Sequence, residues 1–217
     1  MIQRLILILL FVSSFSSLAQ EQDKDLLHIK ERLDTVSAFT ADLKLDVDIS
    51  FINMPQKKAT VEFKKGEPMA FSSEDFALIP KRGLDFSFQE LFEYPFITVD
   101  RGMKTVEGNK LKVVNIIPTD KKADFSIATL YLDLNAERIA ISEISTKKDG
   151  TYTLLLDYPT SESVLPTKVE VQFEMERIRI PLNFMGKDID VDRKKMRKEE
   201  IKTGKIFLTL NYKTISY

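Results

Sequence analysis

The chain has 217 residues, 43% of them hydrophobic, which suffices for one sizeable core or one large barrel-like domain. Its formal net charge of −1 argues against a nucleic-acid-binding protein, which needs an excess of bases to attract phosphates. With no cysteine and a single histidine, His28, the chain cannot assemble a classical catalytic triad, a cysteine nucleophile or a His-built zinc site. We therefore expect no enzymatic activity, no metal and no cofactor.

Residues 1–19 have the pattern of a secretory signal peptide. Arg4 precedes an apolar run over 5–12, and the serine-rich stretch after it has small residues at Ser17 and Ala19. The alternative, a membrane anchor, needs about 20 apolar residues. We expect export and cleavage after Ala19. We also expect one domain over 20–217, because no Gly/Ser/Pro-rich linker interrupts the later pattern.

An amphipathic helix is predicted over 23–36, with Asp23 as a suitable N-cap. Its apolar residues recur at spacings of three and four and therefore share one face: Leu26, Ile29, Leu33 and Val36. This face must pack on the sheet that begins near residue 40.

A long strand is predicted over 40–51, where apolar and polar residues alternate strictly, so that one face is apolar and the other charged. At about 3.4 Å per residue it spans roughly 40 Å, which indicates a large curved antiparallel sheet. After a turn at 53–56, alternation resumes over 59–64, and a third strand starts at 69–71. The apolar face of the first two strands is the expected ligand-binding wall: Leu43, Leu45, Val47, Ile49, Phe51, Val61 and Phe63.

An aromatic-rich segment over 75–99 interrupts the strands. Pro80, Gly83 and Pro95 break regular pairing there, and a short helix is predicted around 87–94. Such a segment either completes the core, which is the commoner case for aromatic residues, or closes over an apolar cavity as a movable cover. The cover would consist of Phe76, Phe86, Phe88, Leu91, Phe92 and Phe96.

Strands return over the rest of the chain. They are predicted at 110–117, 124–134, 138–146, 151–158, 167–180 and 204–216. We count roughly nine to eleven strands, little helix and no regular alternation of strands with helices. This pattern predicts a mainly β (α+β) fold: an incomplete antiparallel β-barrel with an N-terminal amphipathic helix and a short covering helix.

Two segments resemble the periplasmic outer-membrane lipoprotein carrier family, LolA. Within 29–43 the helix ends in a leucine, two further residues and then Val-Ser-Ala-Phe, and it runs straight into the first strand. Within 61–68 a strand ends in a basic residue and a proline, at Lys65 and Pro68. The order of signal peptide, helix and long strand is also that of the family.

The resemblance implies a LolA-like incomplete barrel closed by helices, whose apolar interior holds the acyl chains of a lipoprotein in transit. It also implies that Lys65 and Pro68 belong to the switch that opens and closes the lid. The family has an arginine where this chain has Lys65, which lacks the bidentate fork of a guanidinium, and Gly66 and Glu67 are inserted before the proline. The family's tryptophan-rich strand is missing, because the chain has no tryptophan.

Four acidic residues near the C-terminus have the spacing of a calcium-binding loop: Asp188, Asp190, Asp192 and Glu199. Arg193 stands where the sharp turn needs glycine, and the bases after it would repel a cation. We therefore favour a strand edge that leads into a solvated charged loop. The basic run over 193–205 is alternatively a docking patch for anionic headgroups or for a partner.

The leading hypothesis is a monomeric periplasmic carrier or chaperone that binds lipoprotein acyl chains without covalent chemistry and passes them to the outer membrane, with sorting partners in the inner and outer membranes. Burying an acyl chain yields about 0.8 kcal/mol per CH₂, so binding needs no catalytic group. The alternatives are a lipid- or lipoprotein-binding sensory module of the same fold and a structural envelope protein with a filled core. No hypothesis involves nucleic acid.

Overall fold

The computed structural model describes residues 22–73, 88–176 and 188–217. Its helices in these ranges are α2 (Lys24–Leu33), α3 (Gln89–Phe92) and α4 (Arg193–Lys198). Its strands are β1 (Ala38–Asp48), β2 (Ile52–Asn53), β3 (Lys57–Lys64), β4 (Ala70–Ser72), β5 (Phe96–Val106), β6 (Asn109–Pro118), β7 (Phe125–Asp133), β8 (Arg138–Thr146), β9 (Thr151–Asp157), β10 (Lys168–Met175), β11 (Asp190–Val191) and β12 (Lys202–Ser216). The expected signal peptide lies outside the described residues, as does the end of the strand predicted over 167–180.

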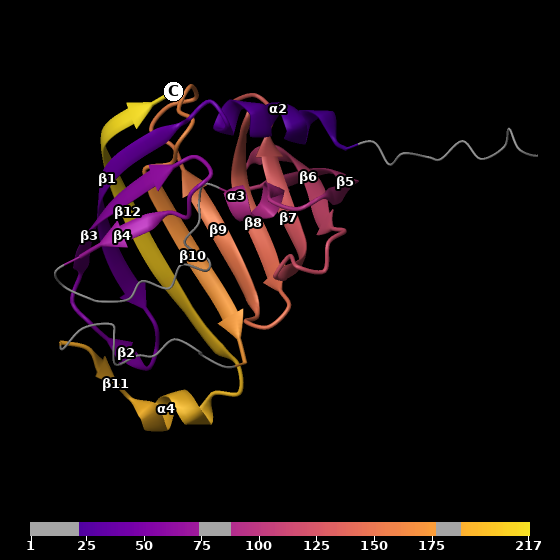
Figure 1. The fold of residues 1–217 in the computed structure, drawn as a ribbon. Helices are drawn as coiled ribbons and strands as arrows, with labels where there is room; N and C mark the ends of the chain where they lie inside the picture. The colour runs from indigo at the N-terminus through magenta and orange to yellow at the C-terminus, as the bar shows by residue number, and fades with distance from the viewer. Residues whose placement is uncertain (1–21, 74–87, 177–187) are drawn as a thin grey trace, which may run out of the picture.

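One antiparallel sheet of ten strands dominates the described residues, in the order β4-β3-β1-β12-β10-β9-β8-β7-β6-β5. Within that part of the chain β4 and β5 are its two edges, and the sheet curves without closing (Figure 1). β2 and β11 form a separate short pair. The predicted incomplete antiparallel barrel, with its N-terminal helix and a short helix beside the sheet, is confirmed.

β1 lies inside the sheet and has the two-faced character that its sequence predicts. It pairs with β3 on one side and β12 on the other, so that Leu43 lies between Ala59 and Leu210. The odd-numbered residues from Phe39 to Leu45 are buried, whereas the even-numbered ones reach solvent. Since both neighbouring strands repeat this alternation, one face of the sheet is continuously apolar.

The predicted ends of three elements are wrong. β1 ends at Asp48, and the chain then reverses, with Ile49 and Ile52 bridging the turn. Alternation persists beyond the strand because Phe51, although in the turn, is only 2% exposed. In the same way α2 ends at Leu33, while the apolar periodicity runs on because Val36 is buried in the turn that follows. The helix predicted around 87–94 is shorter, and α3 has four residues.

Three elements in the described residues were not predicted, and the shortest is β2. β5 extends from the aromatic segment to Val106 and pairs with β6 along its length. α4 occupies the stretch that was expected to be a solvated charged loop, so that expectation is wrong for 193–198.

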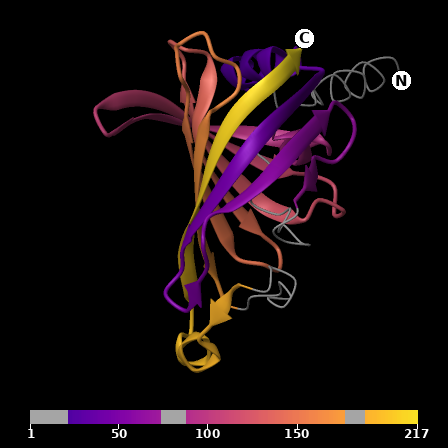
Figure 2. The same ribbon diagram turned by 90° about the vertical axis from the view of Figure 1, so that its left-hand side faces the viewer.

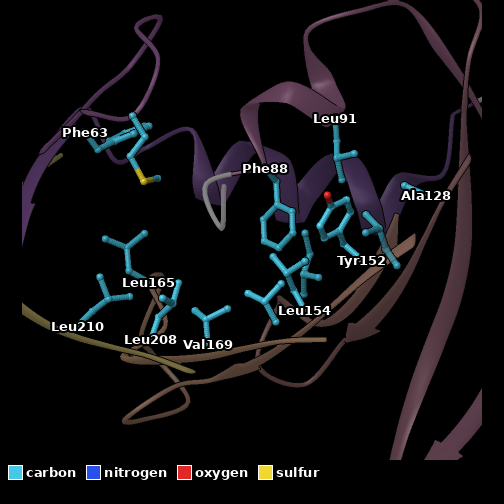
Figure 3. Packing of buried hydrophobic residues seen from close by; sticks show 14 of the residues in the cluster. Phe63, Phe88, Leu91, Ala128, Tyr152, Leu154, Leu165, Val169, Leu208 and Leu210 are labelled. Carbon is cyan, nitrogen blue, oxygen red and sulfur yellow. The ribbon is translucent and has the colours of Figure 1, made fainter. Parts of the chain in front are cut away.

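The core lies on the inner face of the sheet, beneath α2 and α3 (Figure 3). Leu26 and Ile29 of α2 are buried in it, as are Phe88 and Leu91 beside α3. The remaining core residues come from the strands and from the loops between them. The sheet therefore supplies one apolar layer, and the two helices supply the other.

α2 and α4 lie at opposite ends of the molecule (Figure 1; Figure 2). α2 crosses one end of the sheet, whereas α4 follows the β2–β11 pair at the other. None of the helices in the described part of the chain is long and apolar enough to span a membrane.

Candidate functional site

A cleft of about 540 Å³ opens between the C-terminal half of α2, the turn that joins β3 to β4, and α3. Its apolar lining residues are Leu33, Val36, Phe63, Met69, Phe71 and Phe92. Its polar lining residues include Lys30, Asp34, Lys65, Glu67, Gln89, Glu90 and Glu93. The cleft thus joins three segments that are distant in sequence, and it combines apolar surface with charged side chains.

Asp34, the C-cap of α2, connects the cleft's charged residues. Lys30 Nζ lies 2.6 Å from one carboxylate oxygen of Asp34, and Lys65 Nζ lies 3.7 Å from the other. Lys65 Nζ also donates a hydrogen bond of 2.8 Å to the Asp34 carbonyl. The turn after β3 is thereby joined to the end of α2, where a lysine also suits the negative end of the helix dipole.

A second contact across the cleft links α2 to α3. Lys30 Nζ lies 5.7 Å from the centre of the Phe92 ring, within the range of a cation–π interaction. Phe92 in turn lies 5.8 Å from the ring of Phe96 at the start of β5. The segments around the cleft are therefore held together by a few partly exposed side-chain contacts, which are weaker than the pairing of strands in the sheet.

α3 is attached mainly by two buried side chains. Phe88, its N-cap, is 1% exposed, and Leu91 is 3% exposed. In Figure 3 both point from α3 towards Tyr152 and Leu154 of β9. Phe88 adopts a left-handed backbone conformation with φ of 58°, which a bulky residue rarely does, and no side chain caps the helix. α3 is thus short and has little stability of its own.

The predicted apolar wall is assembled in one core cluster, but only Phe63 lines the cleft. Phe63 stacks on Phe39 with 5.0 Å between ring centres. Leu43, Leu45 and Val61 are buried below, and Val47 packs on the same cluster from a half-buried position. Ile49 and Phe51 lie towards α4, where the Phe51 carbonyl accepts a hydrogen bond from the Asp192 amide.

The predicted cover residues are spread over several places in the structure, whereas the two predicted switch residues lie together. Among the cover residues, Phe92 lines the cleft, Phe88 and Leu91 are core residues, and Phe96 belongs to β5. Phe76 and Phe86 lie outside the described residues, as do Pro80 and Gly83. Lys65 and Pro68 both line the cleft, so the two positions identified by family resemblance lie at its edge.

Sequence reasoning missed the anchors that hold α2. Arg32 donates hydrogen bonds to the carbonyls of Ala136, Glu137 (3.0 Å) and Glu162 (2.6 Å), which lie in the β7–β8 and β9–β10 connections. His28 Nε2 lies 3.2 Å from a Glu137 carboxylate oxygen, and both side chains are exposed. No periodic pattern identifies such contacts, because each joins a helix to a distant loop.

The N-terminal end of α2 has its own anchor. Asp23 caps the helix, as predicted, by accepting a hydrogen bond of 3.1 Å from the Leu26 amide. Lys112 of β6 lies 2.7 Å from Asp23 and 2.6 Å from Asp25. Burial alone would lower the pKa of the Lys112 ammonium, but its hydrogen bonds and charge interactions with the two aspartates outweigh burial and raise the pKa.

The four acidic residues with calcium-loop spacing have separate contacts. Asp188 forms an ion pair with the buried Lys57, which lowers the pKa of the Asp188 carboxyl. Asp190 belongs to β11, Asp192 caps α4, and Glu199 accepts a hydrogen bond from the Ser50 hydroxyl. The described residues contain no cluster of three or more acidic or histidine side chains that could hold a metal ion.

No known family profile matches the chain, and no curated protein matches it in sequence. Solved structures do match. A LolA superfamily protein from Nitrosomonas europaea is 7% identical, with a TM-score of 0.48 over 87% of this chain and 91% of its own.

Two further structures resemble the chain. One is an outer membrane lipoprotein-sorting protein domain from Vibrio parahaemolyticus, 11% identical, with a TM-score of 0.46 over 88% of this chain and 92% of its own. The other is a DUF1329 family protein from Desulfovibrio piger, also 11% identical, with a TM-score of 0.46 over 88% and 91% of the two chains. These likenesses concern the fold alone.

Proposed function

We propose that the chain is a noncovalent carrier of lipoprotein acyl chains in the periplasm, and that it binds them through the cleft beside α2. The observation that carries this proposal is the cleft itself. Its volume of about 540 Å³ lies within the range of ligand-binding pockets, about 300–1,000 Å³. Aliphatic and aromatic side chains line it, and lysines and carboxylates surround them.

The cleft is suited to a long apolar ligand with a polar head. Transfer of an acyl chain from water onto Leu33, Phe63 and Met69 would contribute about 0.8 kcal/mol of binding free energy per CH₂. The polar end of the ligand would stay at the charged rim, near Lys30 and Lys65. For the acyl chain to enter beyond the cleft, either Lys65 must separate from Asp34 or α3 must move away from α2. The contacts that would break, Lys65–Asp34 and Lys30–Phe92, are partly exposed. The sequence resemblance around Lys65 and Pro68 supports the same assignment.

Native mass spectrometry of protein purified from the envelope tests what is bound. A carrier is expected to retain lipid or lipoprotein, whereas a structural protein with a filled core is expected to carry neither. A sensory module would retain a lipidated partner without releasing it to acceptor membranes, so a transfer assay separates this alternative from a carrier.

A matched pair of variants tests the site. Leu33→Asp places a carboxylate on the apolar lining and should weaken binding of a fluorescent long-chain fatty acid about tenfold or more, because burying an unpaired polar group costs about 1–3 kcal/mol. Leu134→Asp makes the same change at a position that is 38% exposed and does not line the cleft, and should bind the probe normally. Unchanged binding by a folded Leu33→Asp variant would refute the proposal.

The periplasmic location rests on the pattern of residues 1–19. The protein should fractionate with soluble periplasm and begin near Gln20. N-terminal sequencing and fractionation check this, and an intact N-terminus in the membrane fraction would contradict both the location and the carrier function.

A further inference from the structure

α4 is a strongly basic helix at the end of the molecule opposite α2 (Figure 1; Figure 2). Its sequence is RKKMRK, so it carries five bases and no acid in six residues, and all five bases are exposed. The whole chain has a formal net charge of −1, so everything outside α4 carries −6. This asymmetry would orient the molecule in an electric field, with α4 towards a negative surface.

The helix is attached to the sheet rather than freely solvated. The Asp192 carboxylate accepts hydrogen bonds from the amides of Lys194 (3.0 Å) and Lys195 (2.9 Å), and the Asp192 amide donates to the Phe51 carbonyl (2.9 Å). Met196 packs against the main core cluster. The bases are therefore presented on an ordered projection, so a partner that binds them need not order this segment first.

Three of these bases have no counter-charge. Within the described ranges Lys194, Arg197 and Lys198 form no ion pair, whereas Lys195 donates to the Ser50 carbonyl at 2.7 Å. Three nearby acidic side chains are engaged elsewhere: Asp188 with Lys57, Asp192 as the helix cap, and Glu199 with the Ser50 hydroxyl. Two further acids, the exposed Asp190 and Glu200, flank the helix and reduce the local excess of positive charge. Lys194, Arg197 and Lys198 remain exposed to an external anion.

We propose that α4 docks the protein on the surface of an anionic phospholipid bilayer. Its lysine-rich composition fits this partner better than a protein, because protein interfaces are depleted in lysine and bury about 800 Å² on each side, more than a six-residue helix offers. A bilayer offers a broad layer of phosphates, and adjacent bases add their attractions. Ile201, 51% exposed and three residues beyond α4, supplies an aliphatic side chain for the headgroup region.

This docking goes beyond acyl-chain binding and does not depend on it. Because α2 lies at the other end, the cleft beside it would face the aqueous phase while α4 holds the bilayer. The protein would then reside at a membrane with its cleft accessible to a soluble or membrane-bound donor. Loss of docking should leave fatty-acid binding unchanged, so the failures of the two proposals are distinguishable.

Vesicle co-sedimentation tests the proposal with protein purified from the envelope. The vesicles contain either phosphatidylcholine alone or about 30% phosphatidylglycerol, since the attraction depends on anionic lipid. The test variant is Lys194→Glu, Arg197→Glu, Lys198→Glu. The matched control is Arg101→Glu, Lys110→Glu, Lys168→Glu, which changes one arginine and two lysines at exposed positions away from α4 and alters the net charge equally.

The wild type should bind anionic but not neutral vesicles and should be released as salt shortens the screening length. The test variant should bind at least about 100-fold more weakly, because each of the three lost bases contributes roughly a fivefold factor and the glutamates add repulsion. The control should bind almost as the wild type. The proposal is overturned if the wild type does not bind, if it binds neutral vesicles equally, or if both variants lose the same affinity. If the glutamates prevent folding, glutamine at the same three positions should still weaken binding, and unchanged binding overturns the proposal.

Discussion

Lys65 joins the turn after β3 to the end of α2 at the edge of the cleft. Its side chain is 49% exposed and that of Asp34 is 41% exposed, and such ion pairs contribute about 0–1 kcal/mol. Lys65→Ala should therefore change the free energy of unfolding by less than about 1 kcal/mol but accelerate uptake of a fluorescent fatty acid about two- to fivefold. Stopped-flow fluorescence measures the uptake rate.

The control for this variant is Lys213→Ala, which breaks the similarly exposed ion pair between Lys213 and Asp42, neither of which lines the cleft. It should leave the uptake rate unchanged. Equal rates for Lys65→Ala and the wild type would show that the contact with Asp34 does not limit access to the cleft.

Gly204 marks a point where β12 packs closely against the side chains of Ile49 and Phe173. A Cβ there would lie 2.6 Å from Ile49 Cγ1 and 2.7 Å from Phe173 Cζ. Overpacking of this kind costs about 1–3 kcal/mol, so Gly204→Ala should lower the free energy of unfolding by that amount. Urea denaturation measures the change. Thr203→Ala, an exposed neighbour on the same strand, should cost much less, and equal costs would contradict the packing argument.

At the scale of elements, the N-terminal anchor of α2 predicts a loss of stability at alkaline pH. The Lys112 pKa is raised above its usual 10.5 by Asp23 and Asp25, although burial opposes this. Burial likewise raises the pKa of Tyr158 above 10.0. In both cases the folded state holds its proton more tightly, so the stabilisation is complete below the unfolded pKa and is lost as pH rises above about 10 towards the folded pKa.

Urea denaturation across pH checks this expectation. The free energy of unfolding should fall above pH 10 with a slope of up to about 1.4 kcal/mol per pH unit for each group. Lys112→Met removes one such group and should reduce the slope, while lowering stability at neutral pH because Asp23 and Asp25 lose their cation. If the variant has the wild-type slope, Lys112 does not contribute to the loss of stability at alkaline pH.

The elements that could be predicted from sequence are those with one buried face. β1 and α2 have such a face, so their apolar periodicity identifies them even where it runs past their ends. β5 from Asp100 onwards is exposed on both faces and gives no alternation. α4 contains one apolar residue, Met196. The helix is held in place by contacts with the turn after β1, and no pattern in its own sequence predicts such contacts.

The candidate site was predictable only in part. Lys65 and Pro68 were identified through family resemblance, and Phe63 and Phe92 through apolar and aromatic patterns. Asp34 was not identified, because its importance comes from meeting Lys65, 31 residues away. Most of the predicted wall lies below the cleft, since alternation shows which residues are buried and does not show which of them border a space.

At the scale of the whole molecule, stability is expected to differ between the sheet and the elements around the cleft. β1 pairs on both sides over most of its length, whereas α3 is one turn without a side-chain cap. Opening of α3 away from α2 breaks few contacts and should cost only a fraction of the global unfolding free energy. In the apo protein, amides of 89–93 should therefore exchange faster than those of 40–47.

Hydrogen exchange with and without a long-chain fatty acid tests whether this difference serves binding. Ligand in the cleft should slow exchange in 89–93 and in the turn at 65–69, and leave β1 and α4 unchanged, because neither borders the cleft. Leu33→Asp supplies the control, because the same ligand should protect no segment of this variant. If ligand slows no segment of the wild type, or slows the whole sheet equally, α3 is an ordinary part of the core and does not cover a binding site.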